Sequence, residues 1–171
     1  MPLTAGQAST VFCATLAPLG EITEEQVDQT LGTNVKGVVF TVQKALPLLT
    51  DKASIILIAS TVSTRIDAPG QSIYAASKAA VRNLARGWAL DLAGRGVRVN
   101  AISPGPTKTP GLLDGFPGNE EQVLGLLAQG VPLGRVGEPN EIASAAVFLA
   151  SDEASYVNGI EFFVDGGHAQ V

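Results

Sequence analysis

The sequence has little of the chemistry that depends on cysteine or histidine. Its 171 residues include one cysteine, Cys13, and one histidine, His168. An internal disulfide framework, a zinc site built from cysteines and a metal site built from several histidines are therefore excluded. We expect Cys13 to be buried and His168 to have no catalytic role. A chain of this length can bury a sizeable hydrophobic core and needs no covalent staple.

Positive charge is also scarce. Eleven Lys and Arg stand against 16 Asp and Glu, which gives a net charge of −5 at pH 7. This balance argues against nucleic acid or an anionic membrane as the main partner. The longest apolar runs, such as residues 55–59, fall far short of the roughly 20 residues of a membrane-spanning helix. The N-terminus does not have the pattern of a signal peptide, so we expect a cytoplasmic protein.

Apolar residues are abundant, at 46% of the chain, and 19 glycines and 10 prolines separate the apolar segments. The β-branched run at 54–60 is typical of a strand that is buried on both faces. A capping box begins a helix at Thr23, and Gly32, Asn34 and Gly37 are expected to weaken its middle. The alternation of elements predicts an α/β fold with a parallel sheet and helices on both faces. The strands are expected at 9–13, 54–60, 97–102 and 160–164, and the helices at 23–49, 71–93, 119–129 and 139–150.

Tyr74 and Lys78 lie four residues apart in the long helix predicted at 71–93. This spacing places both side chains on one face of the helix, one turn apart. An ammonium beside a phenol stabilises the phenolate and is expected to lower the tyrosine pKa from about 10. Such a tyrosine can exchange protons with an alcohol or a carbonyl near neutral pH. The pair alone is common and more often structural than catalytic.

The surroundings of this pair favour a site. Ser60 ends a buried strand just before the helix, and Pro104-Gly105 follow the next strand. Ligands of open α/β sheets bind at the carboxyl ends of the strands. Asn34 is a poor helix former, so it marks either a local kink or a break whose freed carbonyl holds a water near Lys78.

Five stretches occur in an order and spacing that resemble the short-chain dehydrogenase/reductase family. They are residues 33–37, 55–60, 74–80, 97–106 and 158–167. The resemblance implies an oxidoreductase that moves a hydride between a nicotinamide cofactor, NAD or NADP, and a small alcohol or carbonyl substrate. It extends from about Ala17 to the C-terminus.

The resemblance also implies roles for individual residues. Tyr74 would be the general acid/base, and Lys78 would lower its pKa and bind the nicotinamide ribose. Ser60 would orient the substrate oxygen, although Thr61 could take its place, and Asn34 would support a proton relay through water. The residues implied in cofactor binding are Tyr74, Lys78, Pro104, Gly105, Thr107 and Thr109.

The chain departs from the family at its N-terminus. Residues 4–7 are not followed by the further glycines of a pyrophosphate-binding turn, and two βαβ units, roughly 70 residues, are missing. We therefore expect a partial Rossmann-like, doubly wound sheet without its first strands, and residues 1–171 as a single truncated domain, the catalytic half. The chain is either a truncated dehydrogenase or a cofactor-free or catalytically silent member that acts in assembly or binding.

Loss of the first strands should expose a sheet edge near residues 11–12 or at 54–60, and an exposed edge invites pairing with another chain. The helix at 71–93 carries apolar residues on several faces, and one face alone can cover the sheet. In the resembled family this helix packs against its copy in a second subunit. We therefore expect a homo-oligomer built on the helix at 71–93. The apolar residues concerned are Ala76, Ala80, Leu84, Trp88 and Leu92.

Overall fold

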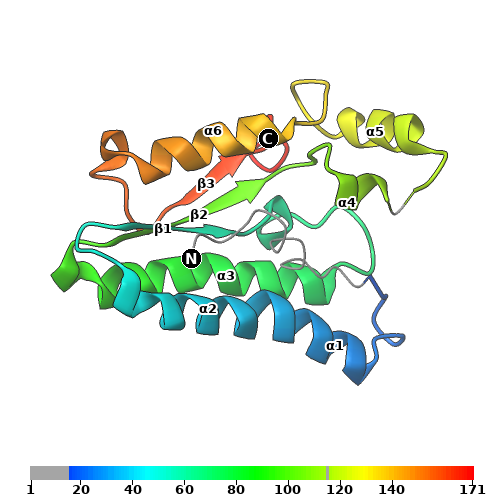
Figure 1. The fold of residues 1–171 in the computed structure, drawn as a ribbon. Coiled ribbons are helices and arrows are strands. Elements are labelled where there is room, and N and C mark those ends of the chain that lie inside the picture. The colour runs from blue at the N-terminus through cyan, green and yellow to red at the C-terminus, as the bar shows by residue number, and fades with distance from the viewer. Residues whose placement is uncertain (1–15, 115) are drawn as a thin grey trace.

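A three-stranded parallel sheet forms the centre of the protein (Figure 1). The computed structural model describes residues 16–114 and 116–171. The strands are β1 (Ser54–Ile58), β2 (Arg98–Pro104) and β3 (Glu161–Val164), in the order β1-β2-β3. Since all three run in parallel, their carboxyl ends meet at one edge of the sheet. The predicted α/β class with a parallel sheet is confirmed; the strand expected at 9–13 and Cys13 lie outside the described residues.

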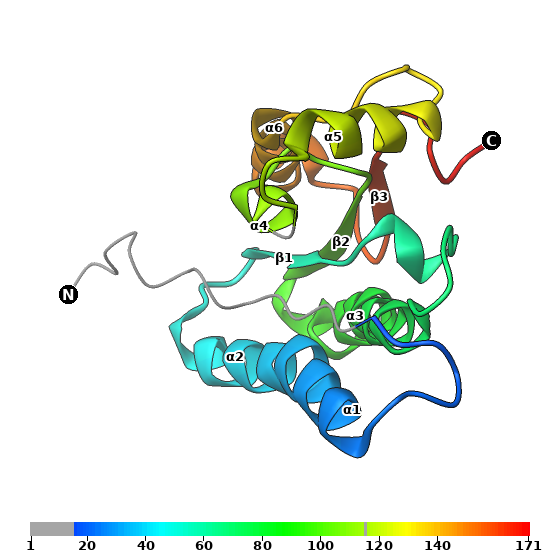
Figure 2. The ribbon, with the colours of Figure 1, turned by 90° about the vertical axis from the view of Figure 1, so that its right-hand side faces the viewer.

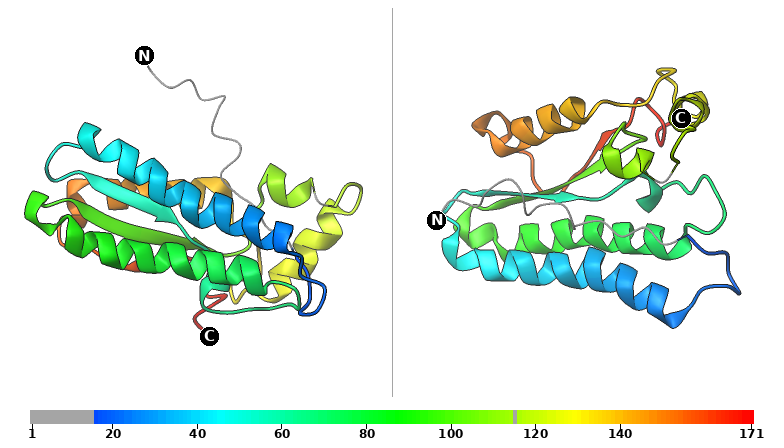
Figure 3. Two further views of the ribbon diagram at one scale, coloured as in Figure 1. Left: turned by 90° about the horizontal axis from the view of Figure 1, so that it is seen from below. Right: turned by 45° about the vertical axis from the view of Figure 1, so that its right-hand side comes forward.

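One face of the sheet is covered by α3 (Ser72–Asp91), and α1 (Glu24–Leu31) and α2 (Val38–Ala45) run alongside it (Figures 2 and 3). The predicted capping box is present, because the Gln26 amide donates to Thr23 Oγ1 and the Thr23 amide donates back to the Gln26 side chain. The weakened middle is a π-helix at Gly32–Gly37, and a 3₁₀ turn at Leu46–Leu48 ends this region.

The core beneath α3 is built from alanines and valines together with Leu57. Val81, Ala85 and Ala89 of α3 pack against Leu57 of β1 and Val99 of β2. Val38 and Val42 of α2 pack against this core from outside. A 3₁₀ turn at Ala93–Arg95 follows α3 and ends at Gly96, whose left-handed conformation is typical of the end of a helix.

The opposite face is covered by α6 (Pro139–Ala150), whose bounds match the prediction. Its Ala145 and Leu149 pack with Ile102 and Ala154 in a second, wholly apolar core. Between β2 and α6 lie α4 (Pro110–Leu113) and α5 (Glu120–Gln129), of which α4 was not predicted. A 3₁₀ turn at Asp152–Ala154 leads from α6 toward β3.

Two expectations about the first strand need correction. β1 ends at Ile58, because Ser60 already caps the 3₁₀ turn at Thr61–Ser63. It is also not buried on both faces: only Leu57 is buried, and Ile58 is 49% exposed. The reason is its place in the sheet, since β1, like β3, is an edge strand among the residues that the structure describes. That position agrees with the edge expected at 54–60.

Candidate active site

Ser60 and Tyr74 meet where the turn after β1 reaches the start of α3. Ser60 caps the 3₁₀ turn at Thr61–Ser63, and its Oγ accepts a hydrogen bond of 3.4 Å from the Val62 amide. The Ser60 side chain is also hydrogen-bonded to Tyr74. Thr61, the alternative hydroxyl, is buried at 3% exposure within the turn. The geometry therefore pairs Ser60, and not Thr61, with the tyrosine.

Lys78 is buried one turn further along α3. Its Nζ donates a 3.0 Å hydrogen bond to the carbonyl oxygen of Ile58, the last residue of β1. Nζ lies 5.8 Å from the centroid of the Tyr74 ring, and both side chains belong to the buried face of α3. The spacing of four residues thus brings the pair together at the carboxyl end of β1, as predicted.

The expected direction of the tyrosine pKa is wrong. Burial raises the pKa of Tyr74 to about 12, and the hydrogen bond from Ser60 offsets only part of this rise. Burial also lowers the pKa of Lys78 to about 8. Both shifts have one cause, because loss of water disfavours the charged form of each group. At neutral pH the phenol therefore holds its proton firmly.

Asn34 supports the backbone of α3 from the π-helix. It is 2% exposed, and its Nδ2 donates a 3.0 Å hydrogen bond to Ser77 Oγ. Ser77 Oγ in turn donates to the Tyr74 carbonyl oxygen at 2.7 Å. The sequence left open a local kink or a break at Asn34, and the structure has a π-helix there that joins α1 to α2. Such segments are frequent at functional sites.

The segment after β2 lies at the same edge of the sheet. Pro104 is the last residue of β2, and a Cβ added at Gly105 would come within 2.8 Å of Asp165. Gly105 is thus required for the close approach of the loop after β3. Thr107 Oγ1 donates to the Gly105 carbonyl at 2.9 Å, and Thr109 caps α4 by accepting from the Leu112 amide.

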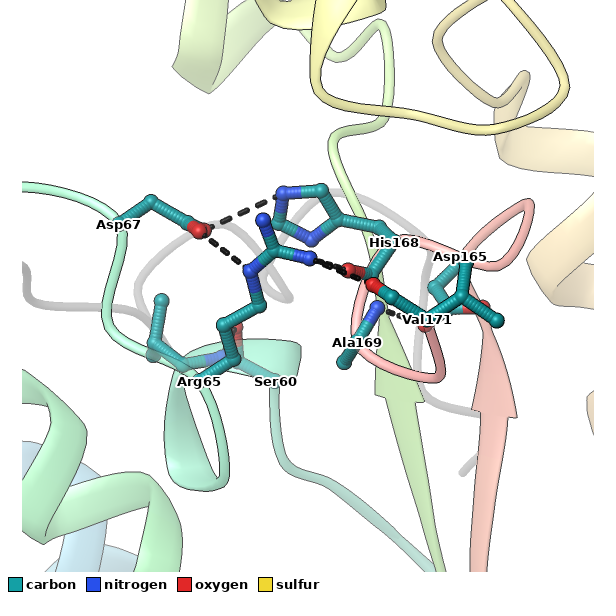
Figure 4. A network of polar contacts seen from close by, with 8 residues as sticks. Ser60, Arg65, Asp67, Asp165, His168, Ala169 and Val171 are labelled. Atoms are coloured by element: carbon teal, nitrogen blue, oxygen red, sulfur yellow. Dashed lines mark hydrogen bonds and ion pairs between the residues drawn. The ribbon is translucent and has the colours of Figure 1, made fainter.

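A polar network that the sequence reasoning missed ties the C-terminal segment to the turn after β1 (Figure 4). Asp67 accepts from Arg65 Nε at 2.8 Å and lies 3.2 Å from His168 Nε2. Arg65 also donates to the carbonyl oxygens of His168 and Val171. His168 is 7% exposed, although a residue so near the end of the chain would be expected to be mobile. No sequence signal links positions about 100 residues apart.

Candidate metal ligands do not gather in the described part of the chain, where no group of three or more His, Cys, Asp or Glu could hold a metal ion. Within residues 16–114 and 116–171, no helix is both long and apolar enough to span a bilayer.

Fold and site together define a Rossmann-like α/β protein with a Ser-Tyr-Lys constellation at the carboxyl edge of its sheet. The family model described as enoyl-(acyl carrier protein) reductase matches residues 5–169. The chain belongs to the short-chain dehydrogenase/reductase family.

Individual relatives agree with this assignment. The chain is 46% identical to oxidoreductase asL5 of Sarocladium schorii, over 90% of this chain and 61% of that protein. It is 40% identical to the 3-oxoacyl-[acyl-carrier-protein] reductase FabG of Thermotoga maritima, over 88% of this chain and 60% of FabG. The chain thus spans about 60% of the length of these relatives.

Solved structures show the same relation. A short-chain dehydrogenase/reductase from Serratia marcescens superposes with a TM-score of 0.84 at 32% identity, over 92% of this chain and 62% of that one. The angucycline C-6 ketoreductase LanV, solved with bound NADP, has a TM-score of 0.84 at 31% identity, over 93% of this chain and 60% of LanV.

Proposed function

We propose that this chain carries the catalytic half of a nicotinamide-dependent oxidoreductase that interconverts a small alcohol and its carbonyl. The observation that carries the proposal is the hydrogen bond between Ser60 and Tyr74, with Lys78 one helical turn away. A bound nicotinamide cofactor would supply or accept the hydride. The protein's own residues would bind and orient the substrate and move one proton.

Tyr74 would hold that proton. Since the pKa of its phenol is about 12, the side chain is protonated at neutral pH and suits proton donation to a carbonyl oxygen during reduction. Ser60 would donate a second hydrogen bond to the same oxygen and so orient it. In the direction of alcohol oxidation Tyr74 would have to lose its proton, so oxidation should become faster as the pH rises.

Lys78 and Asn34 would support this proton donor. The pKa of Lys78, lowered by burial to about 8, leaves the ammonium form prevalent at neutral pH, where its positive charge favours charge development on the phenol. Asn34 acts through Ser77 on the Tyr74 backbone. We keep the proton relay through water at Asn34 as part of the proposal.

The donors at this edge fit the nicotinamide end of a cofactor. The Tyr74 hydroxyl and the Lys78 ammonium lie one turn apart, which suits the neighbouring hydroxyls of a ribose. The Pro104–Thr109 segment adds two threonine hydroxyls and backbone groups at the same edge, so Pro104, Gly105, Thr107 and Thr109 would line the nicotinamide and pyrophosphate. LanV was solved with NADP and a metagenomic blue fluorescent protein with NADPH. We therefore propose NAD or NADP as the cofactor of this chain.

The apolar residues that α3 leaves partly exposed bear on assembly. Trp88 packs partly against the α3 core and also lines a groove of about 140 Å³ between α2 and α3, with Val39, Val42 and Leu92. Leu90 of α3 is 80% exposed. We propose a homo-oligomer that uses α3, in the cytoplasm. Light scattering at micromolar concentration should give at least a dimer, whereas a stable monodisperse monomer contradicts the proposal.

Cofactor binding and turnover test the activity. Titration of the purified protein with NADH and with NADPH, followed by nicotinamide fluorescence, should show binding of at least one. Oxidation of that cofactor with a panel of carbonyl compounds should then be slower in Ser60→Ala. If neither cofactor binds and no carbonyl is reduced, the cofactor-free alternative replaces the enzyme.

A further inference from the structure

Three residues of α3 hydrogen-bond to the end of β1 and to the turn that follows it. Tyr74, Lys78 and Arg82 are spaced by four residues and so lie along one face of the helix. Tyr74 is bonded to Ser60, and Lys78 Nζ donates to the Ile58 carbonyl. Arg82 Nη1 donates to Thr64 Oγ1 at 3.1 Å. These hydrogen bonds therefore extend along α3 for one helical turn beyond Lys78.

Glu161, the first residue of β3, also contacts this turn, from the side of the sheet. Its Oε1 accepts hydrogen bonds of 2.7 Å from both Ser63 Oγ and Ser103 Oγ. Its Oε2 accepts from Arg82 Nη1 at 3.3 Å. The Glu161 side chain is 12% exposed, that of Arg82 is 30% exposed, and Ser103 is fully buried. One carboxylate thus joins β2, β3, α3 and the 3₁₀ turn at Thr61–Ser63.

Such a network is sensitive to the loss of any member. Hydrogen bonds to a charged group are roughly twice as strong as neutral ones. A partly buried carboxylate that loses its cation, or a guanidinium that loses its carboxylate, keeps its desolvation cost without the compensating attraction. Ser63 lies three residues after Ser60, in the very turn that Ser60 caps. A change at Glu161 should therefore reach the Ser60 hydroxyl through this turn.

We propose that Glu161 and Arg82 are positioning residues that hold the turn at Thr61–Ser63 so that the Ser60 hydroxyl stays on Tyr74. Glu161 bonds to Ser63 and Arg82 bonds to Thr64, and both would act on Tyr74 through these residues of the turn. Only the effect on turnover rests on the function proposed above. The effect on the contact between Ser60 and Tyr74 is a property of the chain itself.

Fluorine NMR can measure that contact without any cofactor or substrate. The chain has two tyrosines, and Tyr156 is fully exposed. In a Tyr156→Phe background labelled with 3-fluorotyrosine, one resonance reports on Tyr74 alone. Ser60→Ala in this background gives the resonance position for the lost hydrogen bond. Glu161→Gln and Arg82→Met should each move the resonance toward that position, and the double variant should move it little further.

Asp51→Asn is the matched control. It removes the carboxylate partner of Arg95 at 3.2 Å, beyond the opposite end of β1, and should leave the resonance in place. A Glu161→Gln protein that is folded, less stable and unshifted would show a merely structural role and overturn the proposal. If Glu161→Gln does not fold, Ser63→Ala removes one hydrogen bond to the same carboxylate; a small shift in the same direction supports the proposal, and no shift overturns it.

Turnover adds an independent arm. Misplacement of a reacting group by about 1 Å can cost roughly 100-fold in rate, so we expect Glu161→Gln to lower kcat by about 10- to 100-fold with an unchanged KM for the cofactor. If kcat is unchanged while wild type is active, the positioning role is contradicted. If wild type itself reduces no carbonyl, the proposed function fails, and the fluorine resonance still decides the role of Glu161.

Discussion

The helices α3 and α6 cover opposite faces of the same sheet and do so with different chemistry. The buried residues of α6 are Ala145 and Leu149, both apolar. The buried residues of α3 divide along its length: Tyr74, Ala75, Ser77 and Lys78 lie in its first half, three of them with polar groups, and the apolar Val81, Ala85 and Ala89 follow. The polar half faces the turn after β1, at the edge where parallel strands end. The helix α3 thus buries polar side chains near that edge, whereas α6 buries only apolar ones.

The difference has an energetic side. On the α6 face, burial of the helix removes apolar surface from water, and the polar groups beneath it, such as Arg98 and Asn100, are hydrogen-bonded to backbone atoms. On the α3 face, burial shifts the pKa values of Tyr74 and Lys78 toward their neutral forms. The lysine shift is a cost to folding at neutral pH, because the unfolded chain would hold the charge in water. The α3 face therefore gives up stability for reactivity, and the α6 face does not.

The largest expected effect is on the polar half of α3. Tyr74→Phe should lower carbonyl reduction by about 10²- to 10⁴-fold, because the proton donor is lost while the ring still packs. Circular dichroism should show an unchanged fold. Tyr156→Phe, at a fully exposed tyrosine, should keep its activity. Retained activity in Tyr74→Phe would remove this residue from the proposed mechanism.

The second effect is on the α6 face and concerns stability. Leu149 is fully buried, so Leu149→Ala should lower the free energy of unfolding by about 2–5 kcal/mol. Urea denaturation measures this, and Val147→Ala, at a 69% exposed position of the same helix, should change it by about 0.5 kcal/mol or less. The fluorine resonance of Tyr74 should not move in either variant. A shift in Leu149→Ala would mean that the two faces are coupled.

The elements of both faces were largely predictable from the sequence. The capping box at Thr23 and Pro139 at the start of α6 are local signals that lie where they were predicted. The β-branched run at 54–60 forms a strand as predicted, but that strand ends two residues early, at Ile58. The pairing of Tyr74 with Lys78 followed from helical spacing alone. The position and the apolar character of α6 could be predicted from such local patterns alone.

The rest of the α3 face depends on contacts between distant segments. Glu161 contacts Ser63, which is 98 residues away in sequence. No pattern in either segment predicts this contact. The tyrosine pKa was predicted in the wrong direction because spacing reveals a neighbouring charge but not the loss of water, which dominates here. The sequence likewise could not predict that the helix winds as a π-helix at Asn34. It also could not decide between Ser60 and Thr61, because that choice depends on the geometry of the folded turn.

The third effect separates the faces by pH. The folded-state pKa of Lys78 is about 8, below its value of 10.5 in the unfolded chain. Between these values the unfolded state binds more protons, so stability rises with pH. Lys78→Met should abolish this rise, which amounts to about 2–3 kcal/mol between pH 7 and 10. Urea denaturation of both proteins across this range measures it.

Tyr74 does not mask this effect, because its folded-state pKa of about 12 makes its own contribution decline only above pH 10. Leu149→Ala serves as the control. It should lower the whole stability profile without changing its slope, because no titrating group is altered. An equal slope in wild type and Lys78→Met would show that Lys78 is not desolvated in solution.

The smallest effect concerns the exposed start of α6. Glu141 accepts two hydrogen bonds from Arg135 and one from the Glu138 amide. The hydrogen bond from Arg135 is the main cause that lowers the pKa of Glu141 to about 2. A lowered carboxyl pKa stabilises the fold above pH 4.5, and this contribution is lost as the pH falls toward 2.

Glu141→Gln should therefore lower the melting temperature at pH 7 by less than Leu149→Ala does, because water screens an exposed pair. The gap to wild type should narrow in thermal melts between pH 4.5 and 3, with no movement of the Tyr74 resonance. A gap that stays constant over this range would mean that the charge of Glu141 does not stabilise α6.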